Sequence, residues 1–170
     1  ALLRDVTEQL RLEDELRRHA VTAGLTGLYN RRFLNQSLQS EYSRAVRYQS
    51  PLSILLLDAD HFKRVNDAHG HEKGDQVLKA IAEIMRVELR VNDLPCRYGG
   101  EEFLAILPEC SPEGAHAVAE RVRMVVERSE IAGIRVTVSI GVASFPDVGH
   151  GSCEALGQAA DQALYRAKSS

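Results

Sequence analysis

The sequence of 170 residues lacks the features that mark several protein classes. It contains no tryptophan, and no apolar run approaches the ~20 residues that a membrane-spanning helix needs. No basic segment followed by an apolar one, the pattern of a signal peptide, stands near its start. The chain begins with Ala1 rather than Met, so we expect a piece of a longer protein, which could itself be attached to a membrane.

Cysteine is scarce as well. Cys96, Cys110 and Cys153 are an odd number, and no two of them form a Cys-x-x-Cys pair. This spacing predicts neither a disulfide framework nor a zinc site, and it is typical of the reducing cytoplasm, where we expect this domain to lie. The Gly-x-x-x-x-Gly-Lys-Ser/Thr motif is also missing, which excludes a P-loop nucleotide site.

Positive charge is not in excess. The 21 Lys and Arg residues face 24 Asp and Glu residues, a formal net charge of −3, and aromatic residues make up 5%. We therefore expect no nucleic-acid partner. A single nucleotide held by metal ions is compatible with this charge, because the ions supply the positive charge. With 44% apolar and 26% charged residues, the composition predicts one folded domain.

Apolar periodicity predicts helices over residues 8–22, 31–48, 77–89, 118–126 and 156–167, and strands over residues 53–57, 95–97, 103–107 and 134–140. The central β-α-β-β-α-β order indicates an α+β fold with a ferredoxin-like sheet. A linker helix precedes this domain, which we place at residues 23–170. Leu12, Leu16, His19 and Ala23 are spaced as in a short coiled-coil seam, although an amphipathic helix packed on the domain fits the same spacing.

Two acidic pairs follow predicted strands or turns. Asp58 and Asp60 come after the buried strand, where carboxylates and the Ala59 carbonyl suit a hard cation such as Mg²⁺; acids that merely end a strand are the alternative. Glu101 and Glu102 follow a Gly-Gly turn, which adjacent strands can bring beside the end of the first strand. Crowded like charges are unfavourable unless cations share them, so the cluster suggests two-metal phosphoryl or nucleotidyl transfer; an exposed turn is the alternative.

Polar residues between these pairs suit a purine. Asn66 and Asp75 have the donors and acceptors to bind its polar edge, and a carboxylate suits the N1–H and 2-amino donors of guanine. Asp75 could equally begin a helix. Arg90 and Asp93, three residues apart, could form a salt bridge near a helix end.

Taken together, these segments resemble the GGDEF family, the diguanylate cyclases. The resemblance rests on LTGLYNRR at residues 25–32, DADHFKRVND at 58–67, the glycine pairs GH and GD at 70–71 and 74–75, RYGGEEF at 97–103, VSIGVA at 138–143 and ADQALYRAK at 160–168. These motifs are colinear over roughly residues 23–170.

The resemblance implies a polymerase-palm-like sheet and the condensation of two GTP molecules into cyclic di-GMP, with release of two pyrophosphates. It implies two Mg²⁺ ions per active site, with Mn²⁺ as a substitute, bound by Asp58, the Ala59 carbonyl and Glu101. Glu101 would also be the base for the ribose 3′-hydroxyl, with Glu102 assisting or binding metal. The remaining roles concern the nucleotide: Asn66 and Asp75 would hold the guanine, His71 would line that pocket, and Lys63 and Lys168 would neutralise phosphates.

Each domain would hold one GTP, so two domains must face each other, and we expect a homodimer to be needed for catalysis. The Arg90-x-x-Asp93 motif resembles an inhibitory product site for cyclic di-GMP. There Arg90 would bind phosphate or guanine and Asp93 would accept from the guanine edge. Arg121 would be a secondary arginine of that site, and Arg44 would match one supplied by the partner chain.

The sequence departs from the family pattern at two places. Ala23 stands where the family commonly has Asp, which affects how the entry helix is fastened. The chain ends at Ser170, where family members usually continue with a glycine, a basic residue and a final strand, so we expect that strand to be truncated. Residues 1–7 look like the closing strand of an upstream PAS-like sensor domain, with residues 8–22 as the signalling helix.

Other functions also fit the motifs. A non-catalytic receptor would bind cyclic di-GMP through Arg90 and Asp93, but it would not need crowded carboxylates. A related cyclase could make a different purine dinucleotide, although Asp75 favours guanine. A bare interaction domain would explain the helices and leave the acidic cluster unexplained.

Overall fold

The computed structural model describes residues 1–148 and 151–170. Its elements are, in chain order, α1 (Leu2–Val21), α2 (Arg31–Tyr48), β1 (Leu52–Ala59), α3 (Phe62–His69), α4 (His71–Glu88), β2 (Leu94–Arg97), β3 (Glu102–Pro108), α5 (Pro112–Arg128), β4 (Val138–Phe145) and α6 (Cys153–Ser169). The strands form one sheet in the order β2-β3-β1-β4, and all neighbours are antiparallel. The predicted α+β fold with a ferredoxin-like antiparallel sheet is confirmed.

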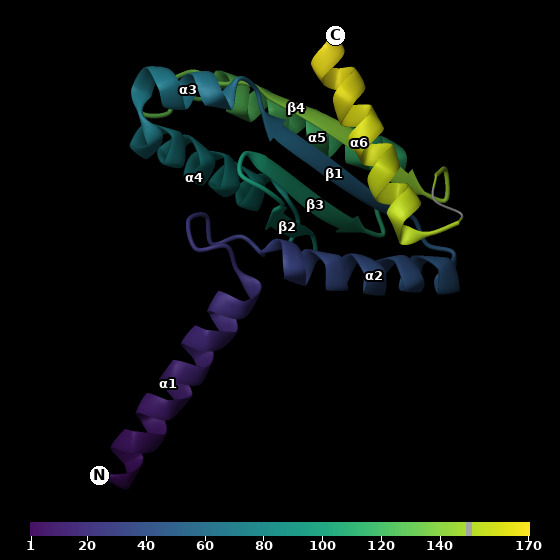
Figure 1. Ribbon diagram of the computed structural model, residues 1–170. Helices are drawn as coiled ribbons and strands as arrows, with labels where there is room; N and C mark the ends of the chain where they lie inside the picture. Colours follow the sequence, from purple (N-terminus) through teal and green to yellow (C-terminus); the bar gives the residue numbers. More distant parts are fainter. Residues whose placement is uncertain (149–150) are drawn as a thin grey trace.

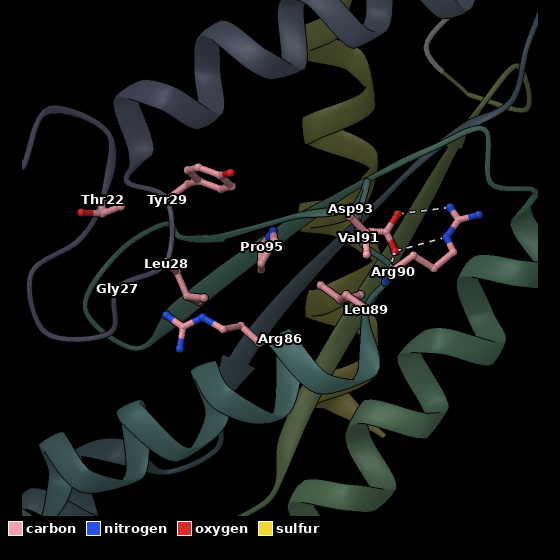
Figure 2. Close-up of a pocket in the computed structure, with 10 residues that line it drawn as sticks. All are labelled: Thr22, Gly27, Leu28, Tyr29, Arg86, Leu89, Arg90, Val91, Asp93 and Pro95. Atoms are coloured by element: carbon pink, nitrogen blue, oxygen red, sulfur yellow. Dashed lines mark hydrogen bonds and ion pairs between the residues drawn. The ribbon is translucent and has the colours of Figure 1, made fainter. Parts of the chain in front are cut away.

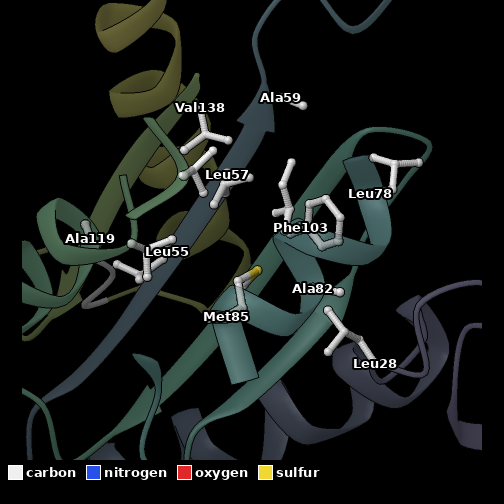
Figure 3. Packing of buried hydrophobic residues seen from close by; sticks show 14 of the residues in the cluster. Leu28, Leu55, Leu57, Ala59, Leu78, Ala82, Met85, Phe103, Ala119 and Val138 are labelled. Atoms are coloured by element: carbon white, nitrogen blue, oxygen red, sulfur yellow. The ribbon is translucent and has the colours of Figure 1, made fainter. Parts of the chain in front are cut away.

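The sheet is covered by helices on both faces (Figure 1). Leu55, Leu57 and Ala59 of β1 pack with α4 and α5, whereas Ile54 and Leu56 pack with α2 and α6. All eight residues of β1 are buried, which explains its unbroken apolar run. Figure 3 shows the first of these two layers, with side chains of the neighbouring strands β1 and β3 packed against those of α4. The buried central strand therefore holds its last residues, including Asp58, in a rigid frame.

Gly141 lets α6 lie directly on β4. A Cβ atom at this position would collide with the carbonyl oxygen of Ala160 and the backbone nitrogen of Leu164, and would lie 2.9 Å from the Leu164 Cα. Only glycine allows two backbones to approach so closely. The position of α6 on the sheet, and of every side chain that α6 carries, thus depends on this residue.

The strand expected over residues 1–7 is wrong, because α1 begins at Leu2. Leu2, Leu3 and Val6 repeat with a helical spacing, and α1 extends away from the sheet (Figure 1). Leu12 and Leu16 are 53% and 69% exposed, so a helix packed on its own domain is also wrong. None of the helices in the described part of the chain is both long and apolar enough to cross a membrane.

Polar contacts fasten α1 to the domain although Ala23 replaces the usual Asp. The Asn30 amide donates from Nδ2 to the Ala20 carbonyl at 2.9 Å, while its Oδ1 accepts from the Phe33 N–H and caps α2. The backbone N–H of Ala23 donates to the Leu28 carbonyl at 2.7 Å. One asparagine thus joins the end of α1 to the start of α2.

Two further elements differ from expectation. Residues 62–69, expected as part of a loop, form α3, whose only buried residue is Phe62. The last strand spans residues 138–145 rather than 134–140. The chain before it makes a tight turn, in which Ile131 and Ile134 exchange two backbone hydrogen bonds and Ala132 and Gly133 have positive φ. The alternating pattern at residues 134–137 therefore continues outside the sheet.

Candidate active site

Two of the expected acidic groups meet at one end of the sheet. Asp58, near the end of β1, lies opposite Glu102, the first residue of β3. Just beyond them, the backbone N–H of Ala59 donates to the Glu101 carbonyl at 3.2 Å. Asp58 is buried, and both glutamates are half-buried. The prediction that the Gly-Gly turn lies beside the end of the first strand is confirmed.

Lys168, in the last turn of α6, brings a positive charge to these carboxylates. Its Nζ lies 2.9 Å from Oδ2 of Asp58, whose side chain is 7% exposed. Burial raises the pKa of the Glu102 carboxyl, the charges of Asp58 and Asp161 raise it further, and Lys168 lowers it. The net direction is upward, with burial as the largest cause, so the one lysine does not offset burial and the neighbouring acids together.

Asp60, the second acid of the Asp-x-Asp motif, is held by hydroxyl groups. Its Oδ2 accepts from Thr137 at 2.7 Å, and its Oδ1 accepts from Ser139 at 2.8 Å. Its backbone N–H also donates to the Thr137 carbonyl at 2.9 Å. Both carboxylate oxygens therefore fasten the start of β4 to the end of β1, which is a structural role.

An unsatisfied acceptor lies at the junction of α3 and α4. Oδ1 of Asn66 is buried and, within the described residues, has no hydrogen-bond partner. It packs on Gly74, where a Cβ atom would collide with this oxygen and lie 3.0 Å from the Asn66 Cγ. Buried polar groups nearly always find a partner, so this oxygen is an acceptor that the described residues leave unused. Gly74 keeps the space that the Asn66 side chain occupies.

The other predicted nucleotide contacts surround this junction. Asp75 follows Gly74 in α4, His71 is the first residue of α4, and Lys63 lies in the first turn of α3. All three side chains are exposed. The structure thus brings Asn66, His71 and Asp75 to one helix junction, while Lys168 joins the carboxylates at the end of the sheet.

The donor atoms at the end of the sheet suit a hard cation only in part. Across residues 1–148 and 151–170, no three His, Cys, Asp or Glu side chains are grouped closely enough to form a metal site. Mg²⁺, however, usually takes one or two carboxylates, substrate phosphates and water rather than a complete protein cage. Asp58, the Glu102 carboxylate opposite it in the register and the Ala59 carbonyl fit that donor set. Glu101, the expected ligand, is tied to this end of the sheet through its carbonyl, which accepts from the Ala59 N–H.

Arg90 and Asp93 bind each other. Nε and Nη2 of Arg90 donate to the two Asp93 carboxylate oxygens at 3.3 and 3.1 Å, and the Arg90 backbone N–H donates to Oδ2 at 2.9 Å. These hydrogen bonds raise the pKa of Arg90. The Asp93 side chain is 0% exposed and that of Arg90 is 56% exposed. Both carboxylate oxygens of Asp93 therefore accept hydrogen bonds from Arg90 and fix the orientation of its guanidinium. Of the two side chains, that of Arg90 is the one exposed to solvent.

The three arginines expected at the Arg90-x-x-Asp93 motif do not all lie together. Arg44 and Arg90 line one hollow of about 590 Å³, where Nη2 of Arg44 lies 3.9 Å from Oε1 of Glu109. Arg121 does not line it; its Nε and Nη2 donate to the side chain and the carbonyl of Glu88 at 2.7 and 2.6 Å. Arg121 therefore ties α5 to the end of α4.

Arg90 also lines a second hollow, of about 440 Å³ (Figure 2). Leu28 and Tyr29 of the α1–α2 connection line it together with Arg86 of α4. Nη2 of Arg86 also donates to the Thr26 carbonyl at 2.6 Å and so holds this connection on α4. Arg90 thus lines both hollows, and the second of them is also lined by the segment that connects α1 to α2.

Sequence reasoning missed two features of this site. It assigned Lys168 to phosphates and not to Asp58, and it gave Asp161 no role. Their spacing of seven residues places Asp161 and Lys168 on one face of α6, and this was the available signal. The position of α6 over the end of β1, which makes that face relevant, depends on tertiary packing.

Comparisons with known proteins agree with the fold and the motifs. The profile of a family described as "Diguanylate cyclase, GGDEF domain" matches residues 20–170. The chain is 44% identical over 157 residues to the response regulator PleD of Caulobacter vibrioides, covering 89% of this chain and 34% of PleD. It is 41% identical over 168 residues to the diguanylate cyclase DgcM of Escherichia coli, covering 98% of this chain and 40% of DgcM.

A solved structure extends the similarity to α1. The coiled coil and GGDEF domain of DgcB from Caulobacter crescentus, in complex with c-di-GMP, superposes with a TM-score of 0.86 at 31% identity. The match covers 99% of this chain and 92% of that chain. The present chain spans 34% to 40% of the length of the two curated relatives, so it corresponds to one part of such proteins.

Proposed function

The chain belongs to the GGDEF family, and we propose that it is the catalytic domain of a diguanylate cyclase, which joins two GTP molecules into cyclic di-GMP and releases two pyrophosphates. The observation that carries this proposal is the meeting of Asp58, Glu102 and Lys168 at one end of the sheet. Two carboxylates and an ammonium group suit a divalent cation and a triphosphate together. A bare interaction domain has no use for such an arrangement.

Guanine binding by Asn66 and Asp75 is supported by the unsatisfied Oδ1 of Asn66. The N1–H and 2-amino groups of guanine are donors, and the Asp75 carboxylate and the Asn66 oxygen are acceptors. His71, exposed at the start of α4, would line this pocket, and Lys63 and Lys168 would bind phosphate oxygens. Adenine lacks the N1–H donor, so this pair of acceptors favours GTP over ATP.

Asp58, the Ala59 carbonyl and Glu101 are the proposed ligands of a divalent cation, Mg²⁺ or Mn²⁺, with two ions per active site. When bound there, such an ion would lower the pKa of the attacking hydroxyl and would stabilise charge on the α-phosphate. Glu101 accepts the proton of the ribose 3′-hydroxyl, and Glu102 assists as a second acceptor or ligand. Lys168 neutralises charge that develops on the phosphate oxygens.

The reaction requires two domains, because each holds one GTP and supplies it to the other. The exposed apolar side chains of α1, among them Leu12 and Leu16, support pairing with α1 of a second copy. The similarity to the coiled coil and GGDEF domain of DgcB covers 99% of this chain, so it includes α1. If a dimer is needed, the specific activity falls on dilution below the dimer dissociation constant, whereas constant activity would refute this requirement.

Product inhibition is the finer part of the proposal. Arg90 is held by Asp93 with much of its guanidinium exposed, so it is available to a phosphate of cyclic di-GMP. Arg44 of the same chain lines this hollow too, whereas the resemblance assigns Arg44 to the partner chain. Arg121 would contribute only after leaving Glu88. Replacing Arg90 with Ala is expected to abolish inhibition by cyclic di-GMP, and unchanged inhibition would contradict the assignment.

The activity is tested by incubating the protein with GTP and Mg²⁺ and measuring cyclic di-GMP and pyrophosphate, with Glu101→Ala alongside. Product from the wild type and none from the variant supports the cyclase. Binding of cyclic di-GMP with no product from either protein would instead favour a receptor that uses Arg90 and Asp93.

A further inference from the structure

The ammonium group of Lys168 binds the carboxylate that we propose as a metal ligand. Nζ of Lys168 lies 2.9 Å from Oδ2 of Asp58, whose side chain is almost fully buried. The influence of Lys168 also reaches Glu102, whose pKa it lowers while the neighbouring acids raise it. One lysine therefore serves as counter-ion to the carboxylates at the end of β1 and β3.

The backbone of Lys168 is held in place, whereas its side chain is free to move. Its backbone belongs to α6, which Gly141 holds on β4 at Ala160 and Leu164. Its side chain is 41% exposed and has a flexible four-carbon stem, so the ammonium can leave Asp58 without moving the helix. The buried carboxylate of Asp58, by contrast, comes from the middle strand of the sheet and cannot follow.

We propose that Lys168 is a displaceable counter-ion, which neutralises Asp58 until a divalent cation takes this carboxylate and which then turns to the triphosphate. The inference rests on the proposed function, because it takes Asp58 as a metal ligand. Two cations at one carboxylate repel each other, so Lys168 and the metal compete for Asp58. A triphosphate draws the ammonium away, which strengthens metal binding, and by linkage the metal strengthens phosphate binding equally.

The test measures binding of Mn²⁺ without nucleotide, so it does not depend on activity. Free Mn²⁺ is followed by its electron paramagnetic resonance signal during titration of wild type, Lys168→Met and Lys168→Arg. Removing the competitor is expected to tighten Mn²⁺ binding to Lys168→Met by roughly fivefold, the size of a partly exposed ion pair. Lys168→Arg keeps the charge and is expected to keep the wild-type affinity.

Arg166→Met is the matched control. It removes one positive charge from the same helix, but Arg166 lines a hollow beside α5, β4 and Asp60, whereas Asp58 does not line that hollow. The ion pair of Asp58 is made by Lys168, and none of the ion pairs among the described residues involves Arg166. Screening by salt limits its effect on Mn²⁺ affinity to less than about twofold. Circular dichroism verifies that each variant is folded, and Lys168→Gln replaces Lys168→Met if that variant unfolds.

Three results would overturn the inference. Equal or weaker Mn²⁺ binding to Lys168→Met, with normal binding to wild type, would overturn it and leave the proposed cyclase standing. An equal gain in Arg166→Met would show that net charge, and not the contact with Asp58, sets the affinity. No binding to either wild type or Lys168→Met would overturn the metal site and this inference together.

Discussion

Replacing Gly141 with Ala is expected to separate α6 from the sheet. The added Cβ atom would collide with backbone atoms of Ala160 and Leu164, and neither can rotate away as a side chain could. Overpacking of a core typically lowers stability by about 1–3 kcal/mol, and a clash between two backbones belongs at the upper end. For a domain of this size, about 3 kcal/mol corresponds to a fall in Tm of roughly 6–12 °C.

The same change should reduce catalysis, because α6 carries Lys168 to Asp58. A displacement of about 1 Å can lower a rate by roughly 100-fold, so even a folded variant is expected to lose most of its cyclase activity. Thermal unfolding by circular dichroism and the rate of product formation measure the two effects separately.

Gly157→Ala is the control for this experiment. Gly157 also belongs to α6, but a Cβ atom there meets nothing within 4 Å outside its own helix. Replacing a glycine inside a helix with alanine stabilises by about 0.5–1 kcal/mol, so the Tm is expected to rise slightly. An unchanged Tm in Gly141→Ala, or equal changes in both variants, would refute the close approach of α6 to β4.

Three other variants test the remaining roles. Asn66→Ala is expected to raise the KM for GTP by about tenfold without lowering the Tm, because Oδ1 has no partner in the described structure whose loss would destabilise the fold. Asp60→Ala should lower stability by about 1–2 kcal/mol, measured by urea unfolding, and leave Mn²⁺ affinity unchanged, because its oxygens bind hydroxyls. Glu102→Gln should raise the Tm in EDTA near neutral pH. The raised pKa of Glu102 means that its ionised form is unfavourable in the folded state, so this gain should vanish as the pH falls below the ordinary glutamate range.

Much of the fold follows from local pattern. The buried apolar run of β1 and the apolar faces of α2, α4, α5 and α6 are strong signals, and the structure confirms each of them. Helix α3 has eight residues and only Phe62 buried, so it gives no usable periodicity. Residues 1–7 contain apolar residues that fit a strand or a helix, and in the structure they belong to α1, which begins at Leu2.

The candidate site divides in the same way. The ends of two adjacent strands predict that Asp58 lies near Glu101 and Glu102. The register places Glu102 opposite Asp58, and the Glu101 carbonyl accepts from the N–H of the next residue, Ala59. The ion pair between Lys168 and Asp58 could not be predicted, because it depends on how α6 crosses the sheet. The burial of Asp93 was also hidden, since an Arg-x-x-Asp spacing is the same in an exposed salt bridge and in a buried one.

The most direct test of the account is the stoichiometry of the reaction with GTP. Wild-type protein at a concentration that favours dimers is expected to form one cyclic di-GMP for every two pyrophosphates, measured by liquid chromatography and a pyrophosphate assay. Glu101→Ala and Asp58→Ala should form neither product, and 3′-deoxy-GTP, which lacks the attacking hydroxyl, should not react. Pyrophosphate without cyclic di-GMP, or equal product from wild type and Asp58→Ala, would contradict the proposed mechanism.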